Sequence, residues 1–175
     1  MTIGRSVSSI ARNAFEDCNK ITTIDIDEEN NTYDSRNHCN AIIETSTNTL
    51  IKGCVRTIIP DGVISIGERA FCNCTFISVA IPNSVTSIDK EAFMGCYGLT
   101  YLTIPKNVTY IGYRAFYGSN LVNLTVEAST PPKNDWNMLE GLSLNVIYVP
   151  KESIEKYRYA DTWFLYKNII KAIEE

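Results

Sequence analysis

One phrase built around the pair Ala-Phe occurs four times in this chain and constrains its fold more than any other feature. The four copies are 56, 22 and 23 residues apart, counted between their phenylalanines, which are Phe15, Phe71, Phe93 and Phe116. A recurrent period near 23 residues is typical of a solenoid, in which short units stack and each contacts mainly its neighbours. Such a fold has no single enclosed core and usually works by offering an extended surface.

Each repeat is predicted to contain one short strand. In the clearest unit, apolar residues with the spacing LxxLxL alternate with Thr and Tyr over 99–104. Pro105 ends this strand because its nitrogen cannot donate to a ladder. Stacked coils set such strands side by side in parallel, and each coil buries its apolar residues against the next. The other expected strands are 21–26, 77–81 and 121–126.

Two further positions recur in the repeat. Gly67, Asp89 and Gly112 share one of them, and because Gly and Asp tolerate positive φ we expect a turn there. A small residue recurs near the end of each unit and is expected to point into the core, as are the repeated phenylalanines. The small residues are Cys18, Cys74, Cys96 and Ser119.

Residues 27–57 interrupt the period, and the stretch 39–54 predicts a β-hairpin inserted between two coils. A turn at 46–47 sets Cys39 opposite Cys54, at a separation that a disulfide can bridge. The alternative is two unpaired thiols packed against the solenoid.

The repeat pattern ends after Val126, so we divide the chain into repeats over 1–126 and a C-terminal cap over 127–175. Within the cap we expect a turn-rich break, a strand at 144–150 and a helix over 151–173. At the other end, residues 2–10 match the middle of a repeat, which predicts further repeats upstream in a longer parent protein. We therefore expect partly exposed apolar residues in this open coil, and self-association through it. They are Ile3, Val7 and Ile10.

Composition argues against several classes of function. The formal charge is −4, and Lys and Arg form no stripe that would fit nucleic acid. No run of 18 apolar residues predicts a membrane span. No phosphate-binding loop, nucleophile elbow, metal-ligand spacing or cofactor motif is found. A thiol enzyme using Cys39 and His38 is a distant alternative, because adjacent residues of a strand point to opposite sides.

The segment "IPNSVTSIDKEAFMGCYGLTYLTIP", at 81–105, resembles the BspA-like leucine-rich repeats found in surface proteins of anaerobic bacteria and some protists. The hairpin insert and the C-terminal ending resemble those of the same family. The resemblance implies a right-handed, curved β-solenoid that is secreted or held at the cell surface. It also implies binding to host or matrix proteins or to other cells, without catalysis. No functional residue is carried over, because the matching positions are structural.

The candidate binding residues come from positions that differ between repeats or face outward. Tyr110 and Tyr113 occupy positions that are polar in other repeats, and Tyr117 lies close by. Tyrosine is enriched at binding surfaces, although these three could instead pack beneath the cap. The second candidate surface is formed by outward positions of the strands. Its residues are Tyr101, Thr103, Asn123 and Thr125.

The sequence therefore favours a non-enzymatic, exported binding or adhesion module that recognises a protein or glycan partner through its repeat surface. The alternative is a structural spacer that presents another domain and has no ligand of its own.

Overall fold

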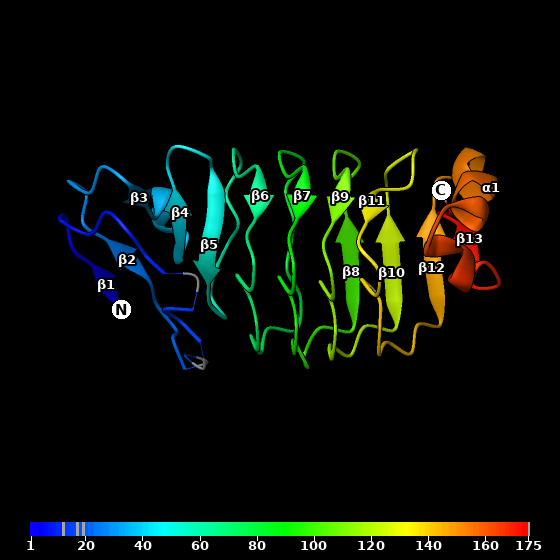
Figure 1. Cartoon of the computed structure of the whole chain (residues 1–175), viewed down its shortest axis with the longest axis horizontal. Helices are drawn as coiled ribbons and strands as arrows, with labels where there is room; N and C mark the ends of the chain where they lie inside the picture. The colour runs from blue at the N-terminus through cyan, green and yellow to red at the C-terminus, as the bar shows by residue number, and fades with distance from the viewer. Residues whose placement is uncertain (12, 17, 19, 175) are drawn as a thin grey trace.

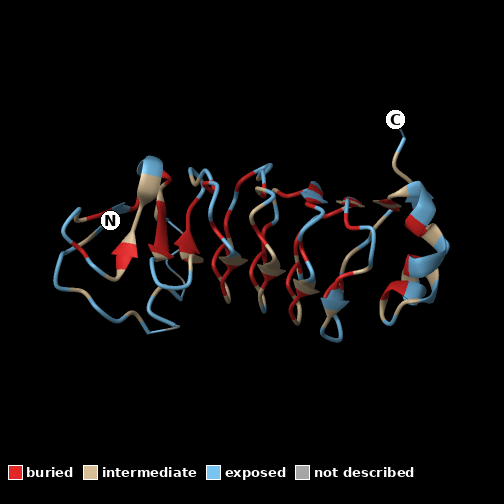
Figure 2. Cartoon of the chain, turned by 90° about the horizontal axis from the view of Figure 1, so that it is seen from above, coloured by how far each residue is buried: buried red, intermediate tan, exposed pale blue. Residues whose placement is uncertain are grey.

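The computed structural model describes residues 1–11, 13–16, 18 and 20–174, and it is a β-solenoid whose coils follow one another along a single axis (Figure 1). The two ends of the chain lie at opposite ends of the solenoid, and the helix α1 (Ile154–Tyr159) closes the C-terminal end. Buried residues line the inside of the coils from end to end (Figure 2). The predicted fold class, a solenoid with mostly parallel strands, is confirmed.

The strands form three sheets. The first pairs β1 (Thr2–Ile3) with β2 (Asp25–Ile26). The second has the order β13-β12-β10-β8, with bounds Ile170–Ala172, Val146–Val149, Asn123–Val126 and Tyr101–Ile104. The third has the order β11-β9-β7-β6-β5-β4-β3, with bounds Lys133–Asn134, Tyr110–Ile111, Ser87–Ile88, Ser65–Ile66, Thr49–Gly53, Ala41–Glu44 and Tyr33–Asp34.

The four-stranded sheet contains two of the strands predicted from the repeat. β8 and β10 pair in parallel, with Tyr101 opposite Asn123, as expected for neighbouring coils. The strand predicted at 21–26 is reduced to its last two residues, and the one at 77–81 is not formed.

The missing strand follows from a one-residue deletion that we placed at the wrong point. Phe76, not Ile77, takes the core position equivalent to Leu99: Phe76 is buried, whereas Ile77 is 72% exposed. The Phe76 ring meets Phe71 and Phe93 edge-on, with centroids 5.5 and 6.3 Å apart. Within the described residues, no backbone hydrogen bond joins 76–82 to β8.

The seven-stranded sheet was not predicted. Its strands β6, β7 and β9 have two residues each, and Ile66, Ile88 and Ile111 point inward from them. Strands this short show no alternation that a sequence pattern could detect. They nevertheless pair in register from coil to coil and give the solenoid a continuous second face.

The turn after this sheet differs from the expected one. Positive φ occurs two residues beyond the Gly position, at Arg69 (57°), Glu91 (55°) and Arg114 (50°). In this conformation the N–H of Arg69 donates to the carbonyl of Lys90 in the next coil, at 3.0 Å. The glycine has another reason: a Cβ on Gly112 would lie 2.5 Å from the nitrogen of Lys90, so the two coils approach too closely for a side chain there.

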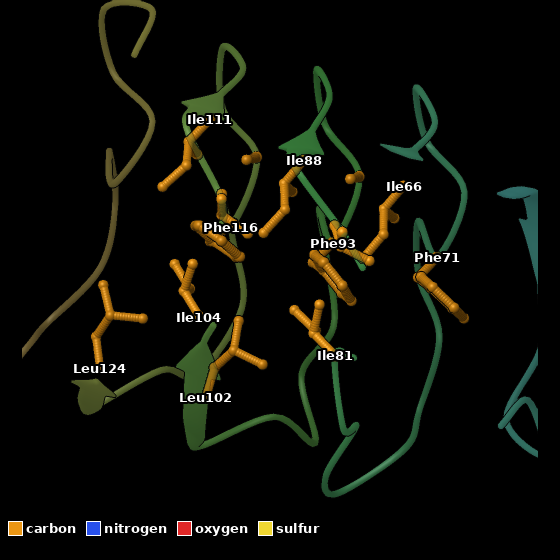
Figure 3. Packing of buried hydrophobic residues seen from close by; sticks show 14 of the residues in the cluster. Ile66, Phe71, Ile81, Ile88, Phe93, Leu102, Ile104, Ile111, Phe116 and Leu124 are labelled. Carbon is orange, nitrogen blue, oxygen red and sulfur yellow. The ribbon is translucent and has the colours of Figure 1, made fainter. Parts of the chain in front are cut away.

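The core is built as ladders of equivalent residues (Figure 3). The rings of Phe71 and Phe93 stack at 5.3 Å, and those of Phe93 and Phe116 at 5.8 Å, all three fully buried. Cys74, Cys96 and Ser119 are also buried, as predicted, while Cys18 is exposed. Within the described residues the Ser119 hydroxyl has no hydrogen-bond partner, whereas the Cys96 thiol donates to the carbonyl of Phe71.

The predicted hairpin is formed by β4 and β5, with Ile43 opposite Leu50. A bulge then shifts the register by one residue, so Ile42 rather than Ala41 faces Lys52. The hairpin is joined on one side to β3 in antiparallel fashion and on the other to β6 in parallel, so it belongs to the coil sheet instead of projecting from it.

The coil geometry continues beyond Val126, where the sequence pattern ended. β11 pairs with β9 and β12 pairs with β10, which completes a further coil. The helix expected over 151–173 is much shorter. α1 has six residues, flanked by the 3₁₀ turns η2 (Lys151–Ser153) and η3 (Trp163–Tyr166), and the chain then adds β13 to the sheet.

Two interior residues secure this C-terminal end. The rings of Tyr157 and Trp163 pack edge to face at 5.1 Å and are fully buried. The Tyr157 hydroxyl donates to the carbonyl of Ala128, and the Trp163 indole N–H donates to that of Pro132. At the N-terminal end, by contrast, Ile3, Val7 and Ile10 remain half-exposed, as expected.

Candidate binding surfaces

Four outward residues of β8 and β10 form the first surface, which we call the sheet face: Tyr101, Thr103, Asn123 and Thr125. Tyr101 lies beside Asn123, and Thr103 lies beside Thr125. Tyr101 is 56% exposed, Thr103 and Asn123 are exposed, and Thr125 is half-buried. The sheet face is thus an uncharged surface of mostly small side chains.

The second surface, which we call the aromatic edge, consists of Tyr113, Tyr117 and Trp136. The guanidinium of Arg114 lies over both tyrosine rings, 5.1 Å from the centroid of Tyr113 and 4.6 Å from that of Tyr117. Arg114 Nε also donates to Glu140 at 2.7 Å. These contacts hold a cation between two aromatic rings at the surface.

Trp136 was missed by the sequence reasoning, and it is 84% exposed. The register of β9 with β11 sets it at the position that Tyr113 has in the preceding coil. A signal was available: Asp135 and Gly141 follow Gly112 and Gly118 by the repeat period of 23 residues.

Tyr110 has a structural contact that sets it apart from the other two tyrosines. Its hydroxyl donates to Asp135 of the next coil at 2.6 Å, and the N–H of Tyr113 donates to the same carboxylate. The hydrogen bond to Asp135 raises the pKa of Tyr110 to about 12. Because Tyr110 is half-buried and joins two coils, the structural alternative fits it better than a role in binding.

The cysteines of the hairpin are separate. Beyond the bulge the predicted opposition of Cys39 and Cys54 is lost, and both are free, buried thiols. Cys39 lies 3.6 Å from the Ser35 hydroxyl, while the Cys54 thiol donates to the carbonyl of Thr22. Burial raises the pKa of Cys39, which keeps it protonated. The predicted disulfide is therefore wrong for this structure.

Other chemistry has little support in the described part of the chain. His38 is exposed in the 3₁₀ turn η1 (Arg36–His38), next to the buried Cys39. No three His, Cys, Asp or Glu side chains gather there in an arrangement that could hold a metal ion. Across the same residues, no helix has the length and apolar character needed to cross a membrane.

Comparison with solved structures shows the same fold in bacterial proteins. A leucine-rich repeat protein from Eubacterium ventriosum aligns with a TM-score of 0.70 and 19% identity over 99% of this chain and 48% of its own. The pneumococcal vaccine antigen PcpA gives 0.64 and 15% over 99% and 55%, and a leucine-rich cell surface protein from Faecalibacterium prausnitzii gives 0.51 and 19% over 99% and 47%. The chain thus spans about half the length of these structures.

No curated protein matches the sequence significantly. The sequence profile of the BspA type leucine-rich repeat region, however, matches six copies over residues 1–53 and 51–166. Since the matched residues make up most of the sequence, the chain belongs to the BspA type leucine-rich repeat family.

Proposed function

We propose that this chain is a non-enzymatic, exported binding module that recognises a protein or glycan partner of a host or its matrix through the aromatic edge. The observation that carries the proposal is the exposure of Trp136, at 84%, beside two tyrosines and an arginine held between them. Trp, Tyr and Arg are the residue types that contribute most binding energy at interfaces.

The repeat itself does not require aromatic residues at this edge. The position of Tyr113 and Trp136 is occupied by Glu68 and Lys90 in two preceding coils, where it is polar. Neither aromatic side chain adds to the core, because Tyr113 is half-exposed and Trp136 almost fully so. Large apolar groups at the surface lower solubility, which supports their use in an interaction.

The aromatic edge is also held in place. The contact of Arg114 with Glu140 and with both tyrosine rings limits the side-chain entropy that a partner's binding would otherwise remove. The sheet face is the second candidate surface, since its neutral side chains would suit a protein or glycan more than a highly charged partner.

The test measures binding of the purified chain to immobilised matrix proteins and mucin glycans. The triple variant Tyr113→Ser, Tyr117→Ser, Trp136→Ser should lose at least tenfold in affinity. The matched control is Tyr97→Ser with Tyr159→Ser, which removes two tyrosines of comparable exposure, 64% and 83%, elsewhere on the surface.

Equal binding by both variants would overturn the role of the aromatic edge. Loss of binding on Tyr101→Ser with Thr103→Ala instead would place the partner on the sheet face. A chain that binds none of the immobilised partners would favour the spacer alternative over a binding module.

A further inference from the structure

Lys52 is a buried cation in a position that the repeat does not explain. Its residue exposure is 5%, and it lies in β5 between the half-buried Ile51 and the buried Gly53. Lysine is almost never buried to this extent unless its ammonium is paired. None of the residues that the structure describes forms a hydrogen bond or an ion pair with the Lys52 ammonium.

The bulge in the hairpin decides which way Lys52 points. Without it, Lys52 would face Ala41 and share the side of Ile43 and Leu50. With it, Lys52 lies opposite Ile42, whose side chain belongs to the cluster against the N-terminal coil. β-Bulges commonly re-aim a side chain next to a functional site.

Lys52 lines a cleft of about 510 Å³ between the N-terminal coil and the seven-stranded sheet. Ile10, Phe15 and Ile51 give this cleft apolar walls, while Asn73 and Thr49 supply polar groups. The volume is within the range of about 300–1,000 Å³ that is usual for small-molecule sites.

The other described cations of the cleft already have carboxylate partners. Arg69 contacts Glu16 at 2.8 Å and Glu91 at 3.6 Å, and Lys90 contacts Glu68 at 3.3 Å. Within the described part of the chain, Lys52 is thus the cleft cation that lacks a counter-ion, and a ligand can supply one.

We infer that the cleft binds a small acidic sugar, with the sugar carboxylate on the Lys52 ammonium. A carboxylate is the simplest group that satisfies an isolated buried ammonium. The amide and hydroxyl groups of Asn73 and Thr49 can both donate and accept, as sugar hydroxyls require, and the half-buried ring of Phe15 offers a flat apolar wall. This site is separate from the aromatic edge, so either assignment can fail without the other.

The test compares galacturonate with galactose, which share a ring scaffold and differ by the carboxylate. Binding is followed through the backbone amide signals of Ile51 and Gly53 in a nuclear magnetic resonance titration. Galacturonate should bind at least tenfold more tightly than galactose. Lys52→Met should remove that preference, whereas Lys90→Met, at a paired lysine of the same cleft, should change affinity less than twofold.

The variants also separate binding from structure. Lys52→Met and Lys52→Gln should leave the melting temperature unchanged or raise it, because they remove an unpaired buried charge. A large drop in both would show that the ammonium has a structural partner and would overturn the inference. Equal binding of the two sugars would do so as well. Saturation by N-acetyl-L-glutamate but not by galacturonate would overturn the sugar assignment in favour of an acidic side chain.

Discussion

The stacked phenylalanines give the sharpest prediction about stability. Phe93 has three ring neighbours, Phe71 at 5.3 Å, Phe116 at 5.8 Å and Phe76 at 6.3 Å. Phe116 is equally buried, yet within the described residues its ring meets one other, that of Phe93. Leu139 occupies the equivalent position in the next coil and is itself buried.

Replacing each phenylalanine by leucine keeps an apolar side chain of similar size and removes the ring. An aromatic pair contributes about 0.5–1.5 kcal/mol beyond its buried area. Phe93→Leu removes three pairs and should lower the free energy of unfolding by about 1.5–4.5 kcal/mol from this source. Phe116→Leu removes one pair and should lower it by about 0.5–1.5 kcal/mol.

Urea denaturation followed by circular dichroism measures both variants against the parent chain. The parent slope with urea should be retained, so that the shift in midpoint reports stability. If Phe93→Leu proves no more destabilising than Phe116→Leu, the ring contacts add nothing and the position needs volume alone. Phe93→Ala, with an expected loss of about 3–5 kcal/mol, confirms that the site is core in either case.

Four further outcomes are expected. Ser119→Cys should raise the unfolding free energy by about 1 kcal/mol in the same urea assay, because it removes a buried hydroxyl without a partner in the described structure. A thiol reagent at pH 8 should modify the exposed Cys18 rapidly and the buried cysteines only after unfolding, as peptide mass spectrometry would show. The pKa of Tyr110 is raised from 10 to about 12 in the folded chain, so its stabilising contribution is complete below pH 10 and lost between pH 10 and 12. The melting temperature should accordingly fall more steeply over that range in the parent than in Tyr110→Phe. Gly112→Ala should lower the melting temperature because its Cβ would meet backbone at 2.5 Å, whereas Gly4→Ala, with nothing within 4 Å, should not.

The periodic part of the fold could be predicted because its signals repeat. The core ladder around Phe93 and the parallel pairing of β8 with β10 both follow from a spacing that recurs along the sequence. The two-residue strands could not be found, since Ser87–Ile88 is too short to show a period. The short helix α1 ends before Asp161, and β13 then forms through pairing with β12, a tertiary contact that the apolar pattern of 151–173 does not reveal.

The candidate surfaces were predicted in part for similar reasons. Tyr101 could be placed on the outer face because strand residues alternate, and the structure sets it there. Trp136 was missed because the apolar pattern of its coil is too degenerate to continue the repeat by eye. The burial of Lys52 depends on a bulge, and a bulge is a property of paired strands that one strand's sequence does not carry.

The segment 76–82, which has no backbone hydrogen bonds to β8 within the described structure, bears on how such arrays change length during evolution. A deletion inside a hydrogen-bonded ladder would shift every pair that follows it. Here the coil lost one residue on the side without a ladder, and the neighbouring two-residue strands β6 and β7 stayed in register. That side of the coil is therefore where insertions and deletions can accumulate while the seven-stranded sheet keeps the repeats aligned.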